Sequence, residues 1–116
     1  MHNKDRILLK KTHEGYGVFE GNSIMPDIPA TLTYKENFDS HIILYAKRAP
    51  LDLVSAEERR IPKLIGIVHT EEEADSRLYE CAREDAEKLS RNTCKPLVDK
   101  THRAKESKLA GKTAQK

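Results

Sequence analysis

The first 70 positions contain several short apolar or alternating segments of strand length, separated by turn residues. In residues 30–36, Leu32 and Tyr34 fall on one face and Thr31 and Thr33 on the other, which predicts a half-buried strand. Residues 41–46 are continuously apolar, as is typical of a strand inside a sheet. Further strands are predicted at 5–11, 18–20, 64–69 and, more briefly, 95–98.

The pattern changes to a helical period after Thr70. Thr70 followed three residues later by Glu73 is typical of a capping box at a helix N-terminus. The helix is predicted over 71–92, with Asn92 as its left-handed cap. One apolar stripe runs along it, formed by Ala74, Leu78, Cys81, Ala82, Ala86 and Leu89.

These elements predict an α+β fold, a mostly antiparallel sheet of four to six strands with one long helix (about 71–92) on one face. Residues 1–98 are expected to form a single domain and residues 99–116 a basic, flexible tail. One helix covers only one face, so the other needs the loop at 25–28, the segment at 51–61 or a second subunit. A homodimer is therefore expected.

The glycines and the segment 64–69 give further predictions. Gly15 and Gly17 flank Tyr16, which predicts a hairpin turn that requires positive φ. The segment 64–69 is interpreted as a buried strand that leads directly into the helix. Gly66 within it indicates a bulge or a close approach of another backbone.

Charge is unevenly distributed although the net charge is only +2. Residues 71–94 hold eight acidic and four basic side chains, whereas residues 95–116 hold seven basic and two acidic ones. No run reaches the roughly 18 apolar residues that a membrane span requires, so no membrane partner is expected. Two cysteines without a CxxC pair favour a reducing, cytoplasmic setting.

Asp85 is the residue that folding explains least, because it falls inside the apolar stripe. A buried carboxylate needs a partner, and the candidates are a histidine or arginine from the sheet, with His41 and His69 as the histidines to consider. Asp85 paired with a histidine would fit a small hydrolase-like enzyme. The alternative is that the stripe drifts and leaves Asp85 at its edge.

No stretch matches a catalytic, cofactor or metal-binding motif. The chain lacks G-x-S-x-G, the Walker loop, G-x-G-x-x-G, HxxxH and CxxC, so no cofactor and no metal site are predicted. Function is therefore sought in surfaces rather than in a catalytic site.

Two sets of charged residues are candidate binding surfaces. The leading hypothesis is a small non-enzymatic binding or regulatory protein that contacts a protein partner through the sheet or the acidic helix face. The alternative is nucleic-acid binding through the Lys-rich tail and the basic pairs. The acidic candidates are Glu72, Glu80, Glu84 and Glu87, and the polyanion-binding candidates are Lys10, Lys11, Lys47, Arg48, Arg59, Arg60, Lys100, Arg103, Lys105 and Lys108.

Overall fold

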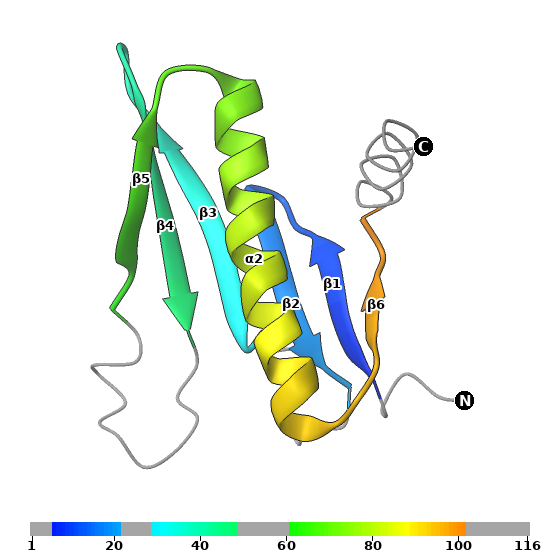
Figure 1. The fold of residues 1–116 in the computed structure, drawn as a ribbon. Coiled ribbons are helices and arrows are strands. Elements are labelled where there is room, and N and C mark those ends of the chain that lie inside the picture. The colour runs from blue at the N-terminus through cyan, green and yellow to red at the C-terminus, as the bar shows by residue number, and fades with distance from the viewer. Residues whose placement is uncertain (1–5, 22–28, 49–60, 102–116) are drawn as a thin grey trace, which may run out of the picture.

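The computed structural model describes residues 6–21, 29–48 and 61–101. Six strands form one sheet in the order β5-β4-β3-β2-β1-β6, and all neighbours are antiparallel except β1 and β6 (Figure 1). The elements are β1 (Ile7–Lys11), β2 (Gly15–Glu20), β3 (Thr31–Asn37), β4 (Ile42–Arg48), β5 (Lys63–Val68), α2 (Glu71–Thr93) and β6 (Leu97–Asp99). The predicted α+β class is confirmed. The predicted tail lies almost wholly outside the described residues.

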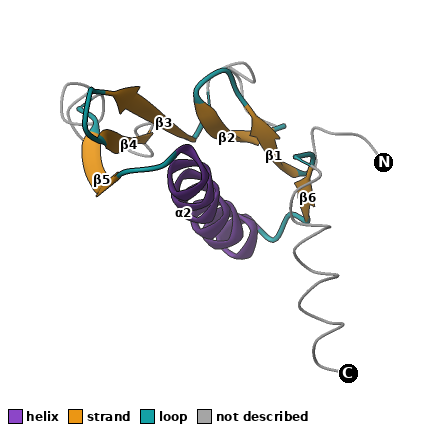
Figure 2. Ribbon diagram, turned by 90° about the horizontal axis from the view of Figure 1, so that it is seen from above, coloured by secondary structure: helices purple, strands orange, loops and turns teal. Residues whose placement is uncertain are grey.

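The helix packs on one face of the sheet, and the sheet curves around it (Figure 2). We call the helix-covered side the concave face and the opposite side the convex face. Three alanines of α2 are fully buried, which lets the helix approach the strands closely. The core between the two layers contains Ile7, Leu9, Tyr16, Val18, Ile42, Leu44, Val68, Ala74, Leu78, Tyr79, Ala82 and Ala86.

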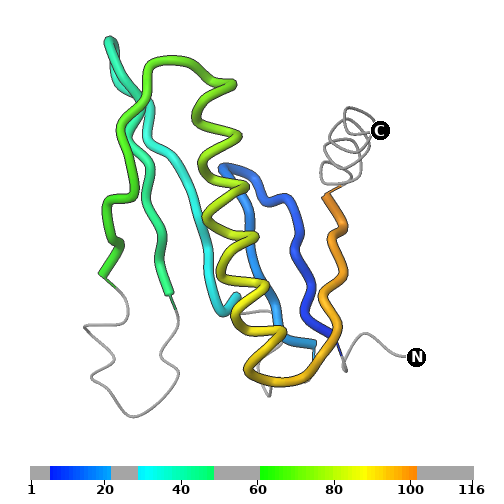
Figure 3. Tube along the Cα trace, in the orientation of Figure 1, coloured from blue at the N-terminus to red at the C-terminus, as the bar shows by residue number. Residues whose placement is uncertain are grey.

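Both ends of α2 are capped. The Thr70 Oγ1 accepts a hydrogen bond from the Glu73 backbone N–H at 3.1 Å, as predicted, while Glu73 Oε1 accepts from the His69 N–H at 3.2 Å. That bond from His69, acting against partial desolvation, is the main cause that lowers the pKa of Glu73. The left-handed C-terminal residue is Cys94 (φ 58°, ψ 32°) rather than Asn92. Helix and strand β5 are joined directly through His69 and Thr70, so the start of α2 follows the end of β5 without a long loop (Figure 3).

A polar cluster fixes β6 to the middle of α2. Tyr79 donates its hydroxyl to Asp99 Oδ2 at 2.6 Å, and Arg83 Nη1 donates to the same oxygen at 3.1 Å. Burial raises the pKa of Asp99, but the bonds from Thr101 and Tyr79 and the Arg83 charge outweigh it, so the pKa is lowered. Asp99 therefore stays ionised and ties the C-terminal strand to the helix.

Two predictions about strands are wrong. The strand at 63–68 is not buried but forms the sheet edge, with Leu64 60% and Ile67 55% exposed. Gly15 and Gly17 do not form the hairpin turn, because both lie within β2 and no glycine in the described ranges has positive φ. The bulge expected near Gly66 is present, as the β4–β5 register shifts between Leu44 and Tyr45.

Candidate protein-binding surface

The convex face of the sheet carries mostly apolar and aromatic side chains. Strand alternation and register assign residues to it, since successive side chains point to opposite faces. No helix among the described residues covers this face (Figures 1 and 2). The convex-face residues are Leu8, Lys10, Phe19, Leu32, Tyr34, Glu36, Ile43, Tyr45, Lys47, Leu64, Ile67 and Val98.

Two tyrosines stack at the centre of the convex face. The rings of Tyr34 and Tyr45 lie 5.3 Å apart at 27°, and Tyr45 donates its hydroxyl to Glu36 at 3.1 Å. Burial and the Glu36 charge raise the pKa of Tyr34, and burial together with the Glu36 hydrogen bond raises that of Tyr45. Both rings therefore remain neutral, and each presents a flat apolar surface beside one carboxylate.

Phe19 forms a second aromatic position on this face. Its ring lies over Gly17, where an added Cβ would come within 2.8 Å of Phe19 Cε1. The Lys10 ammonium sits 4.9 Å from the ring centroid, within the range of a cation–π interaction. Phe19 is only half buried. The face thus offers aromatic contacts over both halves of the sheet.

Strand β5 adds the most exposed apolar residues and an edge without a pairing strand. In the described part of the sheet β5 pairs with β4 alone, so its outer backbone groups have no strand partner. Leu64 and Ile67 are 60% and 55% exposed. An apolar edge strand of six residues is what proteins normally shorten, charge or cover, because it pairs readily with other chains.

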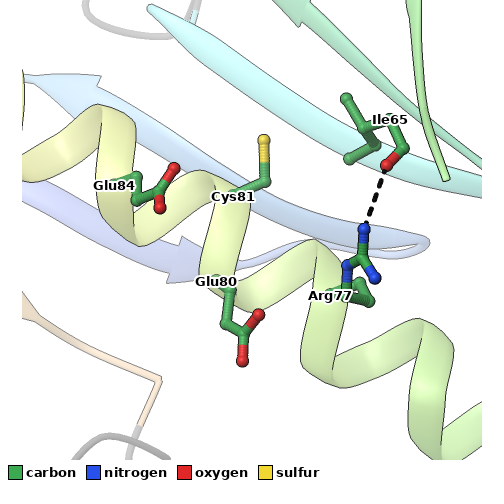
Figure 4. A pocket seen from close by; sticks show the side chains of 5 residues that line it. All are labelled: Ile65, Arg77, Glu80, Cys81 and Glu84. Carbon is green, nitrogen blue, oxygen red and sulfur yellow. Dashed lines mark hydrogen bonds between the residues drawn. The ribbon is translucent and has the colours of Figure 1, made fainter.

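A hollow of about 380 Å³ lies between β5 and α2 (Figure 4). Ile65, Arg77, Glu80, Cys81 and Glu84 line it, and Arg77 Nη2 donates to the Ile65 carbonyl at 3.4 Å. The hollow exists because α2 lies mainly over β2 and β3 and makes few contacts with β5. It joins the β5 edge to the acidic flank of the helix.

Asp85 meets an arginine from the sheet. Arg48, the last residue of β4, donates Nε to Asp85 Oδ2 at 2.7 Å and Nη2 to Oδ1 at 3.2 Å. Thr31 donates its hydroxyl to Oδ2 at 2.7 Å. The hydrogen bond to Asp85 is the largest cause that raises the pKa of Arg48. This bidentate pair ties the helix to β3 and β4.

The structure does not bring Asp85 together with either histidine. His69 Nδ1 contacts the Ser40 carbonyl at 3.2 Å and His41 Nδ1 contacts the Ser40 hydroxyl at 3.0 Å. Ser40 precedes β4, whereas the Arg48 partner of Asp85 ends it. Seven strand residues separate the two ends by roughly 20 Å.

Cys81 lies beside this ion pair, with Arg48 Nη2 3.7 Å from its sulfur. Burial, and to a lesser degree the Asp85 charge, raise the pKa of the Cys81 thiol. A thiol with a raised pKa holds little thiolate, which is the nucleophilic form. Among the described residues, no three His, Cys, Asp or Glu side chains gather as a metal-binding group would.

The Asp85–Arg48 pair gives a stability prediction. Asp85→Asn keeps the shape but replaces charge-assisted hydrogen bonds with neutral ones, so we expect the free energy of unfolding to fall by about 1 kcal/mol. Urea unfolding followed by circular dichroism measures it. Glu80→Gln, at an exposed position in the middle of α2, is the matched control and should change it little. Equal values for the two variants would show that the pair contributes nothing.

The basic candidates divide between the two faces. Lys10 and Lys47 lie on the convex face, whereas Lys11 and Arg48 lie on the concave side, where Lys11 Nζ is 3.8 Å from Asp75 Oδ1. Adjacent strand residues point oppositely, so each of these two pairs supplies one cation per face. Lys100 is exposed just after β6. The other candidates lie outside the described residues, namely Arg59, Arg60, Arg103, Lys105 and Lys108.

The acidic candidates also separate. Glu80 and Glu84 are exposed and line the hollow beside β5. Glu87 instead accepts a hydrogen bond from Arg83 Nε at 3.0 Å, and Glu72 is exposed in the first turn of α2. Sequence reasoning placed all four on one acidic face. It missed the exposed residues of β5, although an apolar strand directly before a helix was visible.

Comparisons with family models, with curated proteins and with solved structures found no match. In the described part of the chain, no helix combines the length and the apolarity needed to cross a membrane.

Proposed function

We propose that this protein is a small non-enzymatic binding module whose convex sheet face docks a protein partner. The observation that carries the proposal is the exposure of Leu64 and Ile67 beside the stacked Tyr34 and Tyr45 on a face that no described helix covers. Apolar patches rimmed by polar residues are typical of protein interaction sites. Tyrosine is enriched at the centres of such interfaces.

A protein partner fits this face better than a polyanion does. The convex face holds Lys10 and Lys47 against Glu36, which is a weak positive balance. Glu36 also lies against the tyrosine pair, where it accepts the Tyr45 hydroxyl. A phosphate near the stack would be repelled by that carboxylate.

The test is affinity capture from cells that express the chain naturally, with wild type, Leu64→Lys/Ile67→Lys and Phe38→Lys as baits. Phe38 is 48% exposed in the turn before β4, so its variant controls for an added lysine at an apolar surface position. We expect a partner that wild type and Phe38→Lys retain and that the double variant loses at least tenfold. A partner retained equally by all three baits would contradict docking at this face.

Single-stranded nucleic acid is the second candidate, favoured by the Lys10–Phe19 contact and by Lys47 next to Tyr45 along β4. Aromatic side chains stack on bases while lysines pair with phosphates. Fluorescence anisotropy with a labelled 20-nucleotide oligo(dT) tests it. Binding that weakens steeply with salt and is lost in Lys10→Glu/Lys47→Glu would favour this function over protein docking.

The hydrolase-like alternative has less support. Both Asp85 oxygens already accept hydrogen bonds from Arg48, and Thr31 donates to one of them as well. A general base must reach a substrate proton within hydrogen-bond distance. Asp85 instead joins secondary-structure elements.

A further inference from the structure

We propose that the outer edge of β5 and the adjoining hollow bind an extended peptide in which Lys or Arg alternates with apolar residues. The inference rests on the proposed function and names the chemistry of the partner. The peptide would add to the sheet as a strand next to β5, a mode in which backbone hydrogen bonds supply affinity and alternate side chains supply specificity.

The backbone of β5 provides the pairing groups. Five of its six residues pair with β4 on one side, Ile65 being the exception, and no described strand lies on the other. The bulge at Leu64–Gly66 turns the Ile65 carbonyl to Arg77, so that acceptor is already used by the helix. Within the described residues, no other strand pairs with the outer backbone groups of β5.

The curvature of the sheet sets which surfaces an added strand would meet. The arch continues from β4 through β5 toward the side of α2 (Figure 2). A strand about 4.8 Å beyond β5 would therefore lie along the hollow between β5 and the helix. One set of its side chains would point to the hollow and the other to the convex side beside Leu64 and Ile67.

The two sets of peptide side chains would face different residues. On the hollow side, Glu80 and Glu84 lie one helical turn apart and outnumber Arg77, whose Nη2 is bonded to Ile65. These exposed carboxylates favour Lys or Arg side chains. On the convex side, Leu64 and Ile67 favour Val, Ile or Leu. Because successive side chains of a strand point to opposite sides, a peptide that matches both sides has basic and apolar residues in alternation.

A second copy of the chain fits this edge less well than a basic peptide does. Two β5 strands paired around a two-fold axis perpendicular to the sheet would place both helices on the same side of the joined sheet. The flanks with Glu80 and Glu84 would then face each other across the seam. Four carboxylates brought together oppose such a dimer, whereas they attract a basic strand.

The experiment is a ¹⁵N NMR titration of the full chain with the blocked peptide SKVKVKVS. We expect shifts concentrated in β5 and in α2 around Glu80 and Glu84, and at least tenfold weaker binding of the charge-reversed peptide SEVEVEVS. Glu80→Lys/Glu84→Lys should reverse this preference. The control Glu14→Lys/Glu72→Lys makes the same charge change at exposed residues that do not line the hollow and should retain it.

Backbone methylation separates strand addition from simple charge attraction. In an antiparallel strand, the N–H groups of alternate residues point to the same side. Two derivatives of SKVKVKVS are compared, the first N-methylated at every lysine and the second at every valine. We expect either derivative to bind like the parent peptide and the remaining one to bind at least tenfold more weakly. Equal loss or equal retention would overturn pairing at the β5 edge.

Other results would also overturn the inference. Equal affinity for the two charge forms, shifts confined to the centre of the convex face, or peptide-independent dimerisation through β5 by light scattering would each do so. The proposed function fails separately. It is contradicted if the Leu64→Lys/Ile67→Lys variant retains the captured partner. If this variant loses the partner but the wild-type chain does not bind the peptide, the edge site alone is rejected.

Discussion

Gly15→Ala is expected to destabilise this protein more than any other single change considered above. A Cβ at Gly15 would lie 1.9 Å from the Thr33 carbonyl oxygen and 2.7 Å from its carbon. Both are backbone atoms in the neighbouring strand β3, so no side-chain rotation relieves the clash. We expect the free energy of unfolding to fall by about 3 kcal/mol or more, at the upper end of overpacking costs.

Gly17→Ala is the matched control for this prediction. There the nearest atom is Phe19 Cε1 at 2.8 Å, which belongs to a half-exposed side chain that can turn away. We expect a loss of at most about 1.5 kcal/mol. Urea unfolding of both variants measures the difference. If Gly15→Ala proved as stable as Gly17→Ala, the close approach of β2 to β3 would be wrong.

The two glycines show where local sequence rules stopped short. A Gly-Tyr-Gly segment fits a turn that needs positive φ, yet both glycines lie in an extended strand. Their role is contact across strands, with Gly15 against the β3 backbone and Gly17 under the Phe19 ring. Contacts between residues distant in sequence leave no periodic signal, so the pattern alone could not distinguish the two uses of glycine.

The helix, in contrast, was predictable because its determinants are local. Thr70 and Glu73 form the N-terminal cap, and Ala74, Leu78 and Ala82 lie buried in the stripe that the period predicts. Tyr79 was missed, since it lies beside the stripe and is buried by tertiary contacts such as that with Tyr16, with ring centroids 5.3 Å apart. Local capping and periodicity therefore determined the helix, and tertiary contacts determined how wide its buried face is.

The candidate site depends on strand order, which the sequence did not reveal. An apolar strand is equally compatible with a central or an edge position, and β5 is at the edge. Asp85 was recognised as anomalous within the stripe, but its ion-pair partner Arg48 lies 37 residues away. Which sheet residue meets a given helix position depends on the pairing of β3 with β4. The expected homodimer stays a prediction.

Strand β3 links the face that binds the helix to the face proposed to bind a partner. Hydrophobicity alone favours burying Leu32 and Tyr34, yet Thr31 and Thr33 are the buried pair, 4% and 0% exposed. Their hydroxyls are used, since Thr31 bonds to Asp85 and Thr33 to the Leu78 carbonyl. Buried hydroxyls with partners carry little penalty. The tyrosine of β3 is thereby left on the convex face.

Thr33→Val tests this arrangement and is expected to lower the free energy of unfolding by about 1–3 kcal/mol. The Thr33 Oγ1 accepts from the Tyr16 N–H at 3.3 Å and lies 3.1 Å from the Leu78 carbonyl, so valine keeps the shape but removes the polar contacts between β2, β3 and α2. Thr31→Val should lower the free energy of unfolding less, because Arg48 still holds Asp85.

Urea unfolding gives the free energies of unfolding of both variants. Amide hydrogen exchange gives a local readout, since Tyr16 should exchange faster in Thr33→Val than in Thr31→Val. If both variants matched wild type, the buried threonine face would contribute only its methyl groups, and apolar packing alone would determine which face of β3 the helix covers.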